Sequence, residues 1–175
     1  MYLCKKTIMK KCLLVILMFF IANVSSQNKK LWAKSFLNTK SPKIEVQGWI
    51  SEKPDTLNKF VLIDFWATWC GPCKKAIPEM NTFSKLFKDR LVVIGISDEN
   101  RRTIKKMKTP VIEYFSAYDT KKRLYKKYQI KGIPHVVLID PNGVVRWEGF
   151  PFLKGEELTR EVIANAIKEF DKESK

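Results

Sequence analysis

The sequence predicts an α/β fold in which helices flank a mixed β-sheet, and three observations carry this prediction. Near-continuous apolar runs at 60–66 and 91–96 have the pattern of strands that are buried on both faces. Stretches with helical periodicity follow these runs, and helices between buried strands are typical of α/β sheets. Two further apolar runs flank Asp140-Pro141-Asn142-Gly143, which indicates a β-hairpin. A terminal hairpin makes the sheet mixed rather than purely parallel.

The individual elements follow in chain order from apolar spacing and turn residues. Strands are expected at 44–50 (a strand or hairpin), 60–66, 91–96, 111–118, 135–139 and 144–150. Helices are expected at about 73–87, 100–108, 119–128 and 156–170. Pro78 lies inside the first of these helices and should kink it, while Asp119 should cap the third.

The first 26 residues have the layout of a secretory signal peptide. Four lysines precede an apolar run of eleven residues from Cys12 to Ala22, and small residues precede Gln27. A membrane-spanning helix needs about 20 apolar residues, so an uncleaved anchor is the weaker alternative. We therefore expect a signal peptide at 1–26, a mobile lead-in at 27–41, one domain at 42–171 and a frayed tail at 172–175.

The cysteine pattern points to redox chemistry. Removal of the signal peptide takes Cys4 and Cys12 away and leaves only Cys70 and Cys73. These two enclose Gly-Pro at the junction of a buried strand and a helix, where the positive end of the helix favours a thiolate at Cys70. A closed zinc site is the alternative, but it needs four N or S ligands, and the remaining two Cys and one His are too few.

Charge does not identify a partner. The chain carries 33 basic and 18 acidic residues, a formal charge of +15, and loss of the four signal lysines leaves 29 against 18, or +11. The basic residues form only small clusters, at 101–102, 105–106, 121–123 and 126–127. None of these clusters belongs to a nucleic-acid-binding module, so we expect solvated helix faces and no nucleic-acid partner. Weak attraction to anionic lipid headgroups stays open.

The active-site segment carries a family resemblance. The run Asp64-Phe65-Trp66-Ala67-Thr68-Trp69-Cys70-Gly71-Pro72-Cys73-Lys74 resembles the active-site segment of thioredoxin. Pro78 matches the helix proline of that family, and Gly132-Ile133-Pro134 resembles its cis-proline loop. The signal peptide, the long middle segment and the ending Leu138-Ile139-Asp140-Pro141-Asn142-Gly143 resemble the TlpA/ResA-type branch of exported thioredoxin-like proteins.

This resemblance covers roughly residues 42–170 and implies a thioredoxin-like fold. A TlpA-type insertion would lie between the second core strand and the strand that follows the cis-proline. In two respects the chain is more similar to a general thioredoxin than to ResA-type members. Ala76 stands where they typically carry an acid, and Asp64 stands where they often have none.

The resemblance also implies the roles of individual residues. Cys70 would be the exposed nucleophile and Cys73 the resolving thiol, with no metal and no cofactor beyond their redox-active disulfide. The remaining implied site residues support the active site or line the substrate groove: Trp69, Gly71, Pro72, Ile133 and Pro134. A cis bond before Pro134 would let the Ile133 backbone pair with an extended substrate.

Two residues keep alternative interpretations. Asp64 stands alone in an apolar strand, where burial disfavours its charged form, so it is a candidate proton acceptor for Cys73. The alternative is a hydrogen-bonded structural acid. His135, the only histidine, either tunes the thiols or is a structural strand residue.

Together these features predict an exported protein-disulfide reductase, in the periplasm or on the outer face of a bacterial membrane, and membrane-associated if the signal is not cleaved. We expect a monomer that acts on oxidised proteins, with apocytochrome c one candidate, and that receives electrons from a CcdA/DsbD-type membrane donor. A disulfide oxidase or isomerase on the same fold is the first alternative. A copper-binding or redox-inert binding module is the second.

Overall fold

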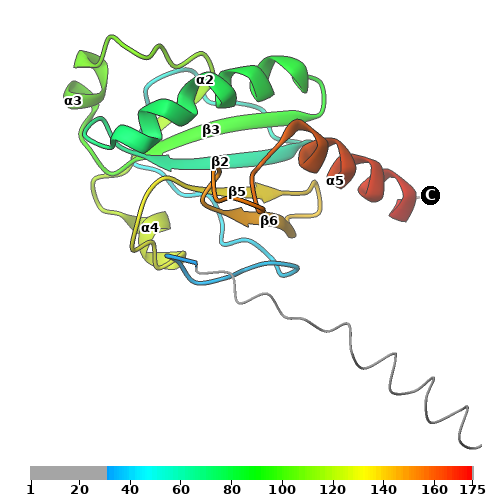
Figure 1. Cartoon of the computed structure of the whole chain (residues 1–175). Coiled ribbons are helices and arrows are strands. Elements are labelled where there is room, and N and C mark those ends of the chain that lie inside the picture. Colours follow the sequence, from blue (N-terminus) through cyan, green and yellow to red (C-terminus); the bar gives the residue numbers. More distant parts are fainter. Residues whose placement is uncertain (1–30, 175) are drawn as a thin grey trace, which may run out of the picture. The chain divides into compact units, whose positions relative to one another are not determined.

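The computed structural model describes residues 31–174, in which four helices flank one six-stranded sheet (Figure 1). The strands are β1 Gly48–Trp49, β2 Phe60–Trp66, β3 Leu91–Ser97, β4 Phe115–Tyr118, β5 His135–Ile139 and β6 Val145–Gly149. The helices are α2 Gly71–Leu86, α3 Arg101–Lys106, α4 Arg123–Lys127 and α5 Arg160–Glu173. The predicted signal peptide, the first part of the lead-in (27–30) and Lys175 lie outside the described residues.

The sheet is mixed, as the sequence predicts. Its strand order is β1-β4-β3-β2-β5-β6. β2 pairs parallel with β3, and β3 with β4, whereas the pairs β1–β4, β2–β5 and β5–β6 are antiparallel. β2 is therefore central, and its residue Asp64 has Gly95 of β3 on one side and Val136 of β5 on the other.

Two hydrophobic clusters fill the two faces of the sheet because the side chains of β2 alternate between them. Phe60, Leu62 and Trp66 point to one face and pack with buried residues of α2 and α5. Val61, Ile63 and Phe65 point to the other face and pack with α4 and with part of the segment before β1. In Figure 1, α2 and α4 accordingly lie on opposite sides of the sheet.

The strand predicted at 111–118 is shorter than expected and covers only 115–118. Asn81 of α2 explains the difference, since its side-chain amide donates to the Val111 carbonyl (2.9 Å) and accepts from the Glu113 amide (2.8 Å). These backbone groups are therefore bonded to a helix side chain instead of a neighbouring strand. The strand predicted at 44–50 is likewise reduced to Gly48–Trp49.

The described part of the lead-in packs on the domain, which differs from the mobile segment predicted for 27–41. The buried carboxylate of Glu148 accepts from the backbone amides of Phe36 (3.0 Å) and Leu37 (3.2 Å) and from the Ser35 hydroxyl. Leu37 also forms an isolated parallel β-bridge with Val145, the first residue of β6. The sequence did not predict this role for Glu148, because a glutamate in a strand of mixed polarity usually faces solvent.

The last helix differs from its prediction at both ends. α5 begins at Arg160, not at 156, because the Thr159 side chain caps it by accepting from the Val162 amide. It also runs to Glu173, so the tail predicted to fray from 172 is helical there. Ion pairs Arg90–Asp171 (2.6 Å) and Arg146–Glu173 (2.9 Å) hold that last turn.

α4 covers 123–127 instead of 119–128. The N-cap residue is Lys122 and not the predicted Asp119, although the Asp119 side chain accepts from the backbone amide of Arg123, the first residue of the helix (2.6 Å). None of the helices between residues 31 and 174 combines the length and the apolar character needed to cross a membrane.

Candidate active site

The disulfide Cys70–Cys73 begins α2 directly after the loop that follows β2. Cys70 is the N-cap residue, and its Sγ accepts from the Cys73 amide at 3.2 Å. Pro72 occupies the first turn, where a missing N–H interrupts no intrahelical bond. A Cβ placed on Gly71 would meet nothing within 4 Å, so this position borders open space.

The two cysteines differ little in exposure. Cys70 is 4% exposed and Cys73 is fully buried, so the sulfur predicted to be an exposed nucleophile is largely covered in the disulfide state. Trp69, the residue before it, is 70% exposed. Trp69 therefore offers an apolar surface beside the disulfide rather than filling the core.

The loop before β5 faces the disulfide. The Ile133–Pro134 peptide bond is cis, as the resemblance implies, and the Ile133 carbonyl oxygen lies 3.8 Å from Cys70 Sγ. Ile133 and Pro134 are thus brought beside the cysteines, although more than 60 residues separate them in the chain.

Trp32 extends this loop region and was not predicted. A Cβ built on Gly132 would lie 3.0–3.4 Å from Trp32 side-chain atoms, and the Lys131 amide donates to the Trp32 carbonyl (2.6 Å). The indole is 56% exposed. No local pattern could have revealed it, because the contact joins the lead-in to a distant loop.

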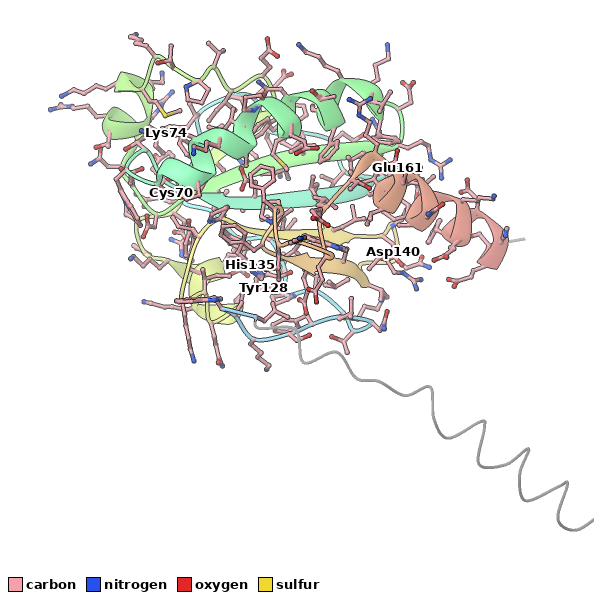
Figure 2. The ribbon with its side chains drawn as sticks, viewed as in Figure 1. Cys70, Lys74, Tyr128, His135, Asp140 and Glu161 are labelled. Carbon is pink, nitrogen blue, oxygen red and sulfur yellow. A yellow bond between two sulfur atoms is a disulfide. The ribbon has the colours of Figure 1, made fainter. Side chains whose placement is uncertain are left out.

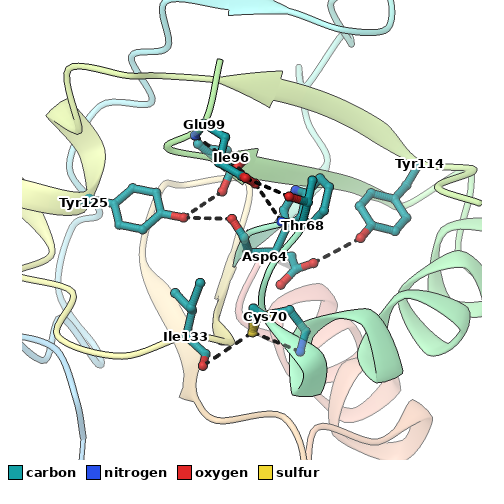
Figure 3. The surroundings of a disulfide bond; sticks show 11 residues. Asp64, Thr68, Cys70, Ile96, Glu99, Tyr114, Tyr125 and Ile133 are labelled. Atoms are coloured by element: carbon teal, nitrogen blue, oxygen red, sulfur yellow. Dashed lines mark hydrogen bonds between the residues drawn. A yellow bond between two sulfur atoms is a disulfide. The ribbon is translucent and has the colours of Figure 1, made fainter. Parts of the chain in front are cut away.

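Asp64 is fully buried on the sheet face that carries the disulfide helix (Figure 3). Its Oδ2 accepts from the Tyr114 hydroxyl at 3.0 Å. Burial raises the pKa of Asp64 to about 7, although the hydrogen bond from Tyr114 lowers it in part. A carboxyl with this pKa can both take up and release a proton near neutral pH. The predicted burial of the acid is confirmed.

Glu99 holds the loop between β2 and the disulfide. Its carboxylate accepts from the amide (2.6 Å) and the hydroxyl (2.7 Å) of Thr68. Sequence reasoning did not single out Glu99. The available signal was that parallel strands β2 and β3 end at the same edge of the sheet, so residues that follow the two strands meet there.

His135 does not face the thiols. Its ring lies 6.1 Å from that of Phe65, which belongs to the cluster on the opposite sheet face. Figure 2 shows Cys70 at the start of α2 and His135 with Tyr128 across the sheet from that helix. The geometry favours the structural interpretation of His135.

No group of three or more His, Cys, Asp or Glu side chains between residues 31 and 174 is arranged to hold a metal ion. The site thus consists of a dithiol/disulfide pair, a buried acid on the same sheet face, and an adjacent backbone loop. A dithiol/disulfide pair can exchange disulfides, and a buried acid beside it can take up and release a proton.

Comparison with known proteins matches residues 58–145 to a family described as thioredoxin-like. The thiol-disulfide oxidoreductase ResA of Bacillus thuringiensis is 32% identical over 127 residues, which cover 71% of this chain and 70% of that protein. The thioredoxin-like protein YneN of Bacillus subtilis is 30% identical over 103 residues, or 55% of this chain. That match spans only 59% of YneN.

Solved structures agree with the fold. The thioredoxin domain of a thiol-disulfide oxidoreductase from Bacteroides vulgatus superposes with a TM-score of 0.59 at 23% identity, covering 78% of this chain and 99% of that domain. The fold, the disulfide and the ResA relative together support thiol–disulfide chemistry at Cys70 and Cys73.

Proposed function

Because this chain belongs to the thioredoxin-like family and is of the ResA type, we propose that it is an exported thiol–disulfide oxidoreductase that reduces protein disulfides. The observation that carries the proposal is the Cys70–Cys73 disulfide at the start of α2, with the Ile133 carbonyl 3.8 Å from one sulfur and a buried acid on the same face.

The first step is attack by the Cys70 thiolate on a substrate disulfide. A bond forms between Cys70 Sγ and one substrate sulfur, and the other substrate sulfur leaves as a thiolate. The Cys73 amide, which points at Cys70 Sγ, and the positive end of α2 favour the negative charge on the attacking sulfur.

The second step releases the substrate. The Cys73 thiol gives its proton to Asp64, and the resulting thiolate attacks Cys70 Sγ. The bond between Cys70 and the substrate breaks, and the second substrate sulfur leaves and is protonated. Two electrons have then passed to the substrate, and the Cys70–Cys73 disulfide needs no other cofactor.

The substrate contacts follow from the exposed parts of the site. An extended segment around the target cysteine pairs with the backbone at Ile133, beside the cis bond to Pro134. Trp69 supplies an apolar surface next to it. The proposed substrates are oxidised proteins with accessible, extended disulfide-bearing segments, and apocytochrome c is one candidate.

The sequence supports the proposed place of action, and the proposed electron source follows from that place. The signal-like layout of residues 1–26 supports action outside the cytoplasm, in the periplasm or at the outer membrane face. After each cycle the Cys70–Cys73 disulfide of such a reductase must be reduced again. We therefore propose a membrane thiol donor of the CcdA/DsbD type. The protein acts as a monomer and without nucleic acid.

A trapping experiment tests the proposal. In Cys73→Ala the second step is blocked, so mixed disulfides between Cys70 and protein substrates should accumulate in the native compartment and disappear on addition of dithiothreitol. The matched control is Cys70→Ala/Cys73→Ala, which should capture nothing. Absence of any Cys70-linked adduct would contradict the function.

The direction of electron flow needs a separate measurement. Equilibration of the Cys70–Cys73 pair with glutathione gives its potential, and 30 mV corresponds to about 1.4 kcal/mol for this two-electron couple. A reduction potential of about −270 mV supports a reductase, whereas a potential of about −120 mV would identify an oxidase on the same fold.

A further inference from the structure

We propose that Tyr114 is a positioning residue for the second step: its hydroxyl holds one carboxyl oxygen of Asp64 and leaves the other oxygen to take the proton of Cys73. This inference rests on the proposed function, because it assigns a role within the same disulfide cycle. It adds a residue of the middle insertion to a site otherwise built from β2, α2 and the cis-proline loop.

The hydrogen bonds divide the Asp64 carboxyl into two unlike oxygens. Oδ2 accepts from the Tyr114 hydroxyl at 3.0 Å, while Oδ1, also buried, has no hydrogen-bond partner among residues 31–174. Figure 3 shows Tyr114 reaching Asp64 from the side away from Ile133. Since one oxygen is occupied by a donor, the other is the acceptor that remains for a thiol proton.

Tyr114 is held in place by α2. The residue before it is held at two points, because the Glu113 carboxylate forms an ion pair with Lys85 (2.6 Å) and the Glu113 amide donates to the Asn81 side chain (2.8 Å). The helix that begins with the disulfide thus also positions the segment that leads to Tyr114. The Tyr114 side chain is 5% exposed, so its ring has little freedom.

Gly95 provides the space for this ring. It sits beside Asp64 in the parallel pairing of β2 and β3. A Cβ at this position would lie 2.9 Å from Tyr114 Cε2 and 3.0 Å from Trp66 Nε1. Any larger residue would therefore push the ring or the indole away, and the missing side chain is what admits the tyrosine.

Few groups near Asp64 can titrate. Its strand neighbours Gly95 and Val136 carry no ionisable side chain. α2 contributes the two cysteine thiols when they are reduced, and the insertion contributes Tyr114. α4 contributes the buried Tyr125, whose hydroxyl donates to the carbonyls of Trp66 and Ile96 and whose pKa is raised by burial and then by the nearby carboxylates of Asp98, Asp64 and Glu99. Burial raises the pKa of Asp64 and the Tyr114 hydrogen bond lowers it, with no cation among the causes. Tyr114 is thus the one side chain that counteracts the effect of burial on Asp64.

Tyr114→Phe removes the hydroxyl and keeps the ring over Gly95. Without this donor the ionised carboxylate loses its hydrogen bond, so its pKa rises further. We expect the pH midpoint of substrate release to move up by about one unit, which makes release about tenfold slower below the midpoint and unchanged well above it. Single-turnover release of a thiol from a disulfide-linked peptide, from pH 5 to 9, measures this shift.

Matched variants separate positioning from a structural effect. Tyr128→Phe removes another buried hydroxyl, one paired with Ser41 on the opposite sheet face, and should leave the midpoint unchanged. In an Asp64→Asn background, where no midpoint is expected, Tyr114→Phe should not change the release rate further at any pH. Gly95→Ala, which displaces the ring instead of removing its hydroxyl, should shift the midpoint in the same direction.

Carbon-13 NMR titration of the Asp64 carboxyl in the folded, oxidised protein gives a second readout. An Asp64 titration and a release midpoint that are both unchanged in folded Tyr114→Phe would overturn the inference and leave the proposed function intact. A midpoint that persists in Asp64→Asn would remove the proton relay itself. Failure of Cys73→Ala to trap substrates would remove the function, so the three failures are distinguishable.

Discussion

At the scale of single residues, Asp64 makes folding stability depend on pH in an unusual direction. Its pKa is about 7 in the folded protein against 3.8 for the ordinary carboxyl. Between these values the native state holds a proton that the unfolded chain has lost. The stabilisation is therefore fully present below about pH 4 and is lost as the pH rises towards 7. About three pKa units at 1.36 kcal/mol each set the scale at about 4 kcal/mol.

Asp64→Asn should remove this dependence, because an amide cannot ionise. Urea unfolding of the oxidised proteins at pH 5 and pH 8 measures it. We expect the variant to gain stability over the wild type mainly at pH 8, by as much as a few kcal/mol. Asp89→Asn, at an exposed position, is the control. Parallel pH profiles for wild type and Asp64→Asn would show that the buried acid does not titrate in this range.

Some residues of the site could be predicted from a short stretch of sequence, and others could not. Cys70, Cys73 and Asp64 were predictable because they share one short segment with a distinctive pattern. Tyr114 and Glu99 could not be predicted as site residues, since only the pairing of the strands brings them to this segment. Tyr114 is 50 positions from Asp64, and nothing in its own surroundings in the sequence marks it as a partner.

At the scale of elements, the buried strands and their order follow from the sequence, whereas several ends do not. β2 was predicted with its observed bounds because an apolar run buried on both faces allows no other placement. The segment 111–114 has the same apolar character but is bonded to Asn81 instead. Strand propensity indicates only that the side chains suit a half-buried sheet surface. Whether a strand forms depends on which tertiary neighbour bonds to the backbone.

The docking of the lead-in on β6 gives an element-scale prediction. Glu148→Ala removes the acceptor of the Phe36 and Leu37 amides and leaves these donors without it. We expect a loss of about 1–3 kcal/mol in the free energy of unfolding. Hydrogen exchange should lose protection at both amides before the core strands do. Glu52→Ala, an exposed substitution, should change neither. Retained protection at Phe36 and Leu37 would contradict this account.

At the scale of the whole molecule, net charge opposes compaction. The full sequence carries +15, and +11 remains without the four signal lysines (29 basic minus 18 acidic), so like charges repel one another in the folded state. Surface ion pairs work the other way, but each exposed pair contributes only up to about 1 kcal/mol. Repulsion should dominate, and salt should therefore stabilise the fold as the screening length falls from about 30 Å at 0.01 M to about 8 Å at 0.15 M.

Thermal unfolding in 10 and 150 mM NaCl checks this, with a higher Tm expected at the higher salt. Arg101→Glu together with Arg102→Glu lowers the net charge by four at exposed positions of α3 and should shrink the salt effect. A Tm that falls with salt in the wild type would mean that ion pairs such as Arg90–Asp171 outweigh the repulsion.

The contact between Asn81 and residues 111–113 has a consequence for protein engineering. A designer who transplants the contiguous stretch from β2 to the end of α2 into another scaffold would carry over both sulfurs and the acid, but not the phenol. The transferable unit is discontinuous: besides the stretch itself, which contains Asn81, it needs the distant loop that this asparagine binds and a glycine on the adjacent strand. A graft of the stretch alone would display the motif with an acid that no longer has its donor.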